Sequence, residues 1–247
     1  MSSIILLLIL SDIHGVWPYS PANPAPKADI TIHCDDLTHI GGLASFKRAI
    51  EDIKTVDAPL KLVIAGNHDL EVDEQWVRNH MEDNEEEAHE EDVNESKKCI
   101  DFLKAQKERG IHYLEEGVHN FELKGGKTLK VYASPYTPKF NGYAFPYTEE
   151  EDRFNADANP IPAEVDIVIT HGQPFLPENH NFTLDVNKDG LHCGCEKLAD
   201  AIRRARPRLH CFGHWLRWTG KLVQRSTLVS WEKKARRSSW FACGTRR

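Results

Sequence analysis

The sequence contains no apolar stretch long enough to cross a lipid bilayer. Its most apolar run, Ile4–Leu10, is far shorter than the ~20 residues that a membrane-spanning helix needs. The residues before this run carry no basic charge, and no small-residue cleavage site follows it, so it is not typical of a secretory signal peptide. Six cysteines are scattered along the chain. We therefore expect a reduced, intracellular protein in the cytoplasm, with no membrane partner.

The chain also lacks a net positive charge. The chain has 31 Lys and Arg against 38 Asp and Glu, a formal net charge of −7. Because nucleic acids attract basic surfaces, we expect no general nucleic-acid binding. Much of the acidic charge lies between Glu71 and Glu95, a segment without a sustained apolar face. This pattern predicts a mobile acidic insertion at about residues 71–97, with helix resuming near Ile100–Arg109.

No internal repeat or interdomain linker interrupts the 247 residues. This length favours a single large α/β domain, which we place at residues 1–220. Apolar spacing predicts a helix between Leu43 and Ile53 and another around Leu198–Ala205. A hairpin is expected around Lys124–Lys127, because its two glycines accept positive φ angles. The expected strands are Ile4–Leu10, Ile30–His33, Leu60–Ala65, Val118–Leu123, Leu129–Ala133, Val165–Thr170 and Leu209–Phe212.

Polar residues recur at the ends of five of these expected strands. In open α/β sheets, ligands bind at the carboxyl ends of strands. Carboxylates, imidazoles and an amide oxygen are the donors that divalent metals accept. One such residue alone is more often an ordinary loop residue, but five matches in chain order favour a metal centre. The candidates are Asp12, His14, Asp36, Asn67, His68, His171 and His214.

These motifs resemble the calcineurin-like metallophosphoesterase superfamily, and within it the small branch of metallophosphoesterase domain-containing proteins. The similarity extends from about residue 4 to residue 214, interrupted by the acidic insertion. It implies a four-layer α/β/β/α sandwich with two mixed sheets and metals at their carboxyl edge. The motifs that carry it are Ser11–Gly15, Ile32–Thr38, Ala65–Asp69, Ser134–Pro138, His171-Gly172 and Pro207–His214.

The resemblance implies two divalent metal ions, with manganese, iron and zinc as candidates. Asp12 and His14 would belong to the first site, and Asp36 would bridge both ions. The remaining ligands, which would bind the second ion, are Asn67, His171 and His214.

The resemblance also implies the reaction, which is hydrolysis of a phosphate ester by a hydroxide that the metals activate. His68 would contact the substrate phosphate and protonate the leaving group. Asp69 would orient a loop or a metal ligand without binding metal itself. The expected substrate is a small phosphate ester, with phosphodiesters favoured and nucleotides among the candidates. Phe145 and Tyr147 are aromatic residues that could stack on a base, although packing is their commoner role.

One departure from the family pattern concerns the first metal site. Leu216 stands where the family has the second histidine of its last motif, so the first site should be weakened. Two alternatives follow: a catalytically impaired or inactive protein on the same fold that binds metal or nucleotide, and an enzyme that uses one metal. His192, Cys193 and Cys195 are conceivable substitute ligands, but their spacing does not form a zinc motif.

Two further departures concern the turn before the bridging carboxylate and the end of the chain. Asp35 stands where the family has glycine, a change that either strains the turn or adds charge near the metals. Residues 221–247 form an atypical basic segment, compatible with a solvated tail, a basic arm or a misread intron. We expect it to have no catalytic role.

Overall fold

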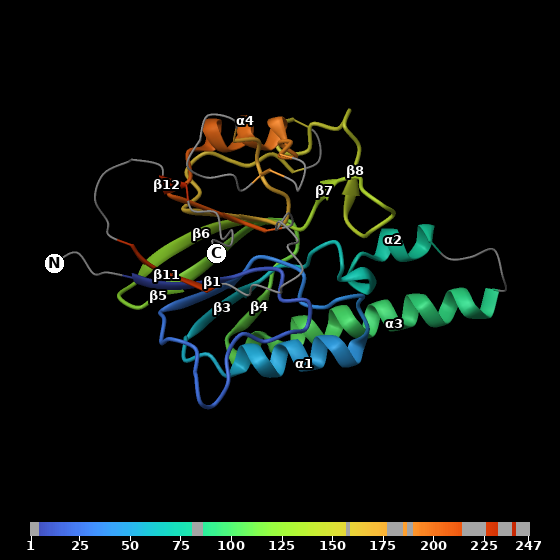
Figure 1. The fold of residues 1–247 in the computed structure, drawn as a ribbon, viewed down its shortest axis with the longest axis horizontal. Helices are drawn as coiled ribbons and strands as arrows, with labels where there is room; N and C mark the ends of the chain where they lie inside the picture. Colours follow the sequence, from blue (N-terminus) through green and yellow to red (C-terminus); the bar gives the residue numbers. More distant parts are fainter. Residues whose placement is uncertain are drawn as a thin grey trace.

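The computed structural model describes residues 5–80, 86–156, 159–176, 185–186, 190–213, 226–231 and 239–240. Two five-stranded sheets pack face to face, and helices cover the outer face of each sheet (Figure 1). Both sheets contain parallel and antiparallel pairs. The predicted four-layer α/β/β/α sandwich with two mixed sheets is therefore confirmed.

The first sheet has the strand order β11-β1-β2-β3-β4. Four of its strands run parallel, and β11 pairs antiparallel with β1. The last four residues of β1 are all buried, as expected for a parallel strand covered on both faces. The strands are β1 (Ile5–Leu10), β2 (Ile30–His33), β3 (Leu60–Val63), β4 (Ile111–Tyr113) and β11 (Ser226–Trp231).

The second sheet has the order β12-β10-β9-β6-β5. The predicted hairpin is its β5–β6 pair, in which Gly125 and Gly126 have φ angles of 89° and 71°. A small separate sheet joins β7 (Thr137–Pro138) to β8 (Pro146–Tyr147). The strands of the second sheet are β5 (Gly117–Leu123), β6 (Lys127–Ser134), β9 (Ile167–Thr170), β10 (Leu209–Phe212) and β12 (Ser239–Trp240).

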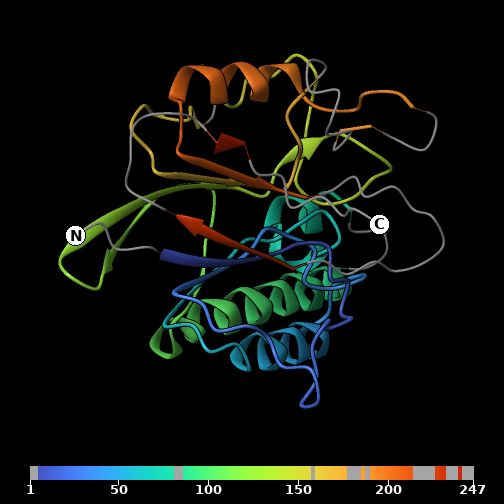
Figure 2. The same ribbon diagram turned by 60° about the vertical axis from the view of Figure 1, so that its left-hand side comes forward.

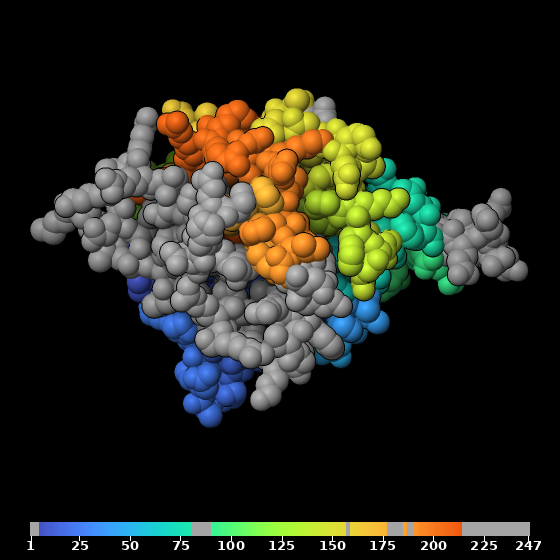
Figure 3. Space-filling view, turned by 45° about the horizontal axis from the view of Figure 1, so that its top comes forward, coloured from blue at the N-terminus to red at the C-terminus, as the bar shows by residue number. Residues whose placement is uncertain are grey.

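Three apolar layers hold the sandwich together. Residues such as Ile32 and Ile169 meet between the two sheets. Helices α1 (Leu43–Lys54) and α3 (Glu86–Lys104) pack on the outer face of the first sheet, and α4 (Glu196–Ala205) packs on the second (Figure 2). This arrangement leaves the carboxyl ends of the parallel strands for the site. Figure 3 shows the N-terminal residues in blue and α4 in orange on opposite sides of one face.

The acidic segment differs from the prediction. Its residues form a 3₁₀ turn at Leu70–Val72, α2 at Glu74–Asn79 and most of the 19-residue helix α3. The expectation that helix resumes only near Ile100 is therefore wrong, and the residues Ala105–Arg109 after α3 form a second 3₁₀ turn. Glu, Lys and Ala favour helix, and the buried stripe of α3 is too narrow and polar to stand out in the sequence. That stripe consists of Ser96, Cys99, Ile100 and Leu103.

Two strands from residues 221–247 join the two sheets, although this segment has no alternating apolar pattern that would predict a strand. In β11, Ser226 pairs with Leu10 and Trp231 with Ile5, so this strand closes one edge of the first sheet. β12 pairs in parallel with β10. Within the described part of the chain, none of the helices combines the length and apolarity that spanning a bilayer requires.

Two fully buried histidines make stability depend on pH. Burial lowers the pKa of His33 and of His210 from 6.5 to about 3. His210 Nε2 donates to Thr170 Oγ1 at 2.9 Å, because the Thr170 hydroxyl itself donates to the Gly172 carbonyl. The neutral imidazole therefore belongs to the folded state, and the unfolded chain binds the additional protons as pH falls.

We expect the free energy of unfolding to fall as pH drops below about 6.5, and to keep falling until about pH 3. Each buried histidine contributes at most ~1.4 kcal/mol per pH unit in that interval. His210→Gln keeps a donor for Thr170 without a titrating group, so its urea-unfolding free energy should depend less steeply on pH. Equal slopes for the variant and the wild type between pH 4 and 6 would contradict this account.

Candidate metal centre

The candidate residues lie in the loops that follow the strands of both sheets. Asp12 and His14 follow β1, and Asp36 follows β2. Asn67 follows β3 of the same sheet, whereas His171 follows β9 of the other sheet. The structure brings these five predicted metal ligands together. The sixth, His214, lies outside the described residues, as does Leu216.

One group of donors consists of Asp12, His14 and Asp36. One ligand atom from each lies within 4.8 Å of the others. His14 Nε2 is 3.8 Å from Asp36 Oδ2, and the backbone N–H of His14 donates to the Asp36 carbonyl at 3.0 Å. All three residues have positive φ angles, between 43° and 49°. Left-handed backbone costs a non-glycine residue about 1–2 kcal/mol, and such strain tends to cluster at functional sites.

A second group surrounds His171. Its Nε2 lies 2.6 Å from Asn67 Oδ1 and 3.8 Å from Asp36 Oδ1. The two carboxylate oxygens of Asp36 therefore face different groups, one containing His14 and the other His171. Asp36 Oδ1 also accepts from the backbone N–H of His68 at 3.0 Å. A Cβ atom on Gly66 would collide with Asp36, so this close approach of the loops after β2 and β3 requires glycine.

The electrostatics of these residues favour a bound cation. Burial raises the pKa of Asp36 well above its usual range, and the nearby charge of Asp12 raises it further. Burial and the neighbouring His68 lower the pKa of His14 to about 4, so its imidazole is neutral. Neutral imidazole and crowded, buried carboxylates are the donor set of a divalent metal, whose charge would relieve the repulsion between the carboxylates. The residues present therefore fit a divalent ion.

Asp35 has a role that the sequence alone left open. Its backbone lies outside the left-handed region, so aspartate needs no glycine-like conformation here. Its fully buried carboxylate accepts from the Asp12 backbone N–H at 3.0 Å through Oδ1. Its Oδ2 lies 2.8 Å from His171 Nδ1. Burial and the neighbouring charges of Asp12 and Asp36 raise the pKa of Asp35. Asp35 thus adds a carboxyl group beside the donors, and its Oδ2 contacts the ring of His171, whose Nε2 faces Asn67.

His68 lies at the accessible rim of the site. Its Nδ1 is 2.7 Å from the His39 carbonyl oxygen, which can only accept, so Nδ1 carries the proton and Nε2 has a free lone pair. Burial lowers the pKa of His68. The ring of Tyr143 lies 4.6 Å from that of His68 between centroids. Neither His39 nor Tyr143 belongs to a strand-end motif, so the sequence alone did not indicate them.

Asp69 ties the loops after β2 and β3 together. Its carboxylate accepts from the backbone N–H groups of Leu37, Thr38 and Gly66 at 2.9–3.1 Å, and from the Thr38 hydroxyl at 2.8 Å. Burial raises the pKa of Asp69 to about 6, against these donors, which lower it. Asp69 is therefore placed to orient the loops that carry Asp36 and Asn67.

Other candidates from the sequence lie elsewhere. Phe145 and Tyr147 are each only 5% exposed and pack into apolar clusters, so they offer no surface to a base. His192 Nδ1 lies 2.8 Å from Asp185 Oδ2, and Cys195 caps the N-terminus of α4. Neither these two nor Cys193 joins a group of candidate ligands in the described part of the chain.

The fold and the donor set together define an α/β sandwich with a candidate divalent-metal centre at its strand ends. Residues 5–217 match the family model of calcineurin-like phosphoesterases, and the chain belongs to that family. Its branch is that of the metallophosphoesterase domain-containing proteins, as the motifs predicted.

Three relatives show the extent of the similarity. "Probable rhamnogalacturonate lyase C" of Emericella nidulans is 30% identical over 214 residues, which are 86% of this chain and 17% of that protein. "UPF0046 protein C25E10.12" of Caenorhabditis elegans is 28% identical over 82% of this chain and 64% of that protein. "Metallophosphoesterase domain-containing protein 1" of Homo sapiens is 29% identical over 76% of this chain and 54% of that protein. The matches therefore cover less than two thirds of each relative.

Proposed function

We propose that the protein is a metal-dependent phosphoesterase that prefers small phosphodiesters. The observation that carries this proposal is the position of Asp36, whose two oxygens face two separate groups of donors. Asp36 would therefore be the residue shared by two divalent ions, one held with each group of donors. Manganese is the first metal to test, with iron and zinc as the other candidates.

The residues that would hold the metals follow from this geometry. Asp12 and His14 would bind the first ion, Asn67 and His171 the second, and Asp36 both. His214 remains a predicted ligand of the second ion. When bound, divalent metals polarise the phosphoryl oxygens and make a water molecule nucleophilic near neutral pH.

His68 is the residue suited to proton transfer. Its Nδ1–H is fixed by the His39 carbonyl, so Nε2 is the atom that exchanges a proton with a ligand. The negative charge of a bound phosphate raises the pKa of a nearby histidine, which offsets the effect of burial. Protonated Nε2 would then donate to the oxygen of the departing alcohol.

The surface beside His68 supports the preference for diesters, because a diester carries a second organic substituent that a monoester lacks. The half-exposed Tyr143 beside His68 offers a flat apolar surface to the second substituent of a diester. Nucleotide diesters are therefore among the candidates.

The test compares two diesters on protein stripped of metal and titrated with manganese. Bis-(p-nitrophenyl) phosphate has a good leaving group that needs little protonation, whereas a 2′,3′-cyclic nucleotide expels an alkoxide. We expect manganese to activate hydrolysis of both. His68→Asn should lower kcat about a hundred-fold for the cyclic nucleotide and much less for the nitrophenyl ester. Metal content should stay close to that of the wild type.

Three results would count against the proposal. Absence of hydrolysis at any manganese concentration, from protein with a cooperative unfolding transition, would favour a protein that only binds metal or nucleotide. If His68→Asn lowered kcat equally for both substrates, His68 would not be the general acid. Loss of metal from His68→Asn would mean that His68 is a ligand of the manganese centre.

A further inference from the structure

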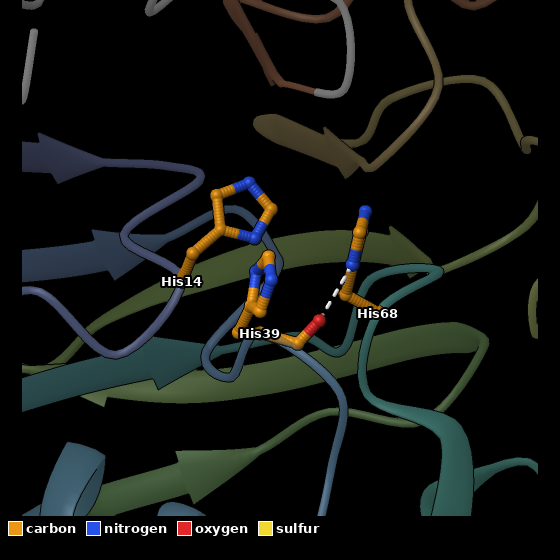
Figure 4. Close-up of side chains that lie close together, drawn as sticks. All are labelled: His14, His39 and His68. Carbon is orange, nitrogen blue, oxygen red and sulfur yellow. Dashed lines mark hydrogen bonds between the residues drawn. The ribbon is translucent and has the colours of Figure 1, made fainter. Parts of the chain in front are cut away.

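Three imidazole rings meet at the rim of the metal centre. His14, His39 and His68 come from the loops after β1, β2 and β3, and Figure 4 shows their rings gathered around one space. One ring nitrogen of each lies within 4.8 Å of the others. The ring centroids of His14 and His68 are 4.8 Å apart, and those of His39 and His68 are 5.8 Å apart. This group shares His14 with the carboxylate group but contains no carboxylate.

The hydrogen bond between the His39 carbonyl and His68 Nδ1 orients the His68 ring for ligand binding. The His39 carbonyl fixes the proton of His68 on Nδ1 and leaves the lone pair on Nε2 (Figure 4). Metal-binding histidines commonly donate their other ring N–H to such a carbonyl, which sets both tautomer and ring orientation. His39 thus contributes its backbone to His68 and its ring to the same space.

The position of the rings is also informative. His39 is exposed, whereas His14 and His68 are partly buried, so the group opens towards solvent. Apolar packing does not explain three imidazoles at an open rim. Three imidazoles with a fourth, open position are the ligand set of several zinc centres, and imidazole suits zinc and cobalt better than it suits manganese.

We propose that His14, His39 and His68 form a three-histidine site for a borderline divalent metal such as Zn²⁺ or Co²⁺. His39 is the ligand specific to this site, because His14 and His68 also belong to the proposed phosphoesterase centre. The site does not depend on phosphoesterase activity. If the proposed function is correct, zinc bound here occupies the lone pair of His68 and inhibits hydrolysis.

The first experiment measures zinc binding to metal-stripped protein by equilibrium dialysis with elemental analysis, in the absence of substrate. His39→Ala removes the ring but keeps the carbonyl that orients His68. We expect this variant to lose one zinc ion per chain, or to bind it at least about a hundred-fold more weakly, since loss of an orienting partner alone costs 10–100-fold. His39→Asp, which restores a ligand, should recover part of the affinity.

His80→Ala is the matched control, because His80 is another exposed histidine and lies outside the group. Asp36→Asn tests whether the site is separate, and it should retain zinc on the histidines while losing manganese. Zinc binding by His39→Ala with wild-type stoichiometry and affinity would overturn the proposal. Equal loss of zinc from Asp36→Asn would overturn the separate site and assign His39 to a single mixed centre.

If manganese-dependent hydrolysis is found, a second readout becomes available. Zinc added to the manganese-loaded protein should inhibit the wild type and His80→Ala at concentrations that leave His39→Ala active. Equal inhibition of all three proteins would contradict an inhibitory role for this site. Failure to detect hydrolysis would affect the proposed function alone, because the dialysis experiment contains no substrate.

Discussion

Asp36→Asn is expected to lower the manganese-dependent turnover of a phosphodiester about ten-thousand-fold, which corresponds to ~5.5 kcal/mol of transition-state stabilisation. Asp36 is the carboxylate whose oxygens face both His14 and His171, so its loss weakens both proposed metal sites at once. Asparagine keeps the oxygen that accepts from the His68 backbone N–H, which limits any rearrangement of that loop. Steady-state kinetics and manganese content measured on the same preparation would check this.

The thermal stability of the metal-free protein should increase with the same substitution, although turnover falls. Burial and the charge of Asp12 raise the pKa of Asp36, so its anion is unfavourable in the metal-free fold. Metal-free Asp36→Asn should therefore unfold at a higher temperature than the metal-free wild type at neutral pH, as is common when a functional charge is removed. Asp57→Asn, on the exposed pair with Lys27, serves as a control for both measurements. If Asp36→Asn turned over substrate within ten-fold of the wild type, Asp36 would not be the carboxylate shared by the two metal sites.

The sequence predicted the part of the fold that depends on local patterns. β1, β2 and β3 are apolar runs that end in polar residues, so their strand ends could be read directly. The carboxyl ends of parallel strands lie at one edge of the sheet, which explains why Asp12, Asp36 and Asn67 lie close together. The β5–β6 hairpin was equally local, since two adjacent glycines mark its turn.

The missed elements depend on tertiary packing. α3 buries only a narrow stripe against α1 and the turn at Leu70–Val72, and its other faces are acidic. The amphipathic pattern of α3 is weak. Packing against the neighbouring apolar surface therefore stabilises this helix more than its own sequence does. β11 also depends on tertiary packing, because its six residues form a strand by pairing with β1 at the edge of the sheet.

The same distinction applies to the candidate site. Motif spacing predicted the candidate ligands at strand ends, but it could not place His39 or Tyr143, which reach His68 through the shapes of two loops. Asp35 appeared only as a departure from the family pattern. Its contacts with Asp12 and His171 join two strand ends from different sheets, and such a contact has no sequence spacing to reveal it.

The shape of those loops depends on Asp69, and Asp69→Ala is expected to destabilise the protein by about 4 kcal/mol, lowering Tm by ~10 °C. The substitution leaves the backbone N–H groups of Leu37, Thr38 and Gly66 without their acceptor in a buried place. Each unsatisfied buried donor costs about 1–3 kcal/mol, less where water can enter. Urea unfolding and calorimetry at neutral pH would measure the loss.

A graded series separates hydrogen bonding from packing. Asp69→Asn keeps one acceptor oxygen at nearly the same volume, so it should cost about half as much as Asp69→Ala. Both variants loosen the loops that carry Asp36 and Asn67, so manganese affinity should fall about 10–100-fold even where the protein remains folded. Asp200→Ala, on the exposed surface of α4, should change neither quantity. If Asp69→Asn were as stable as the wild type, the contacts of this carboxylate would not hold the two loops together, and the position of Asp36 would need another explanation.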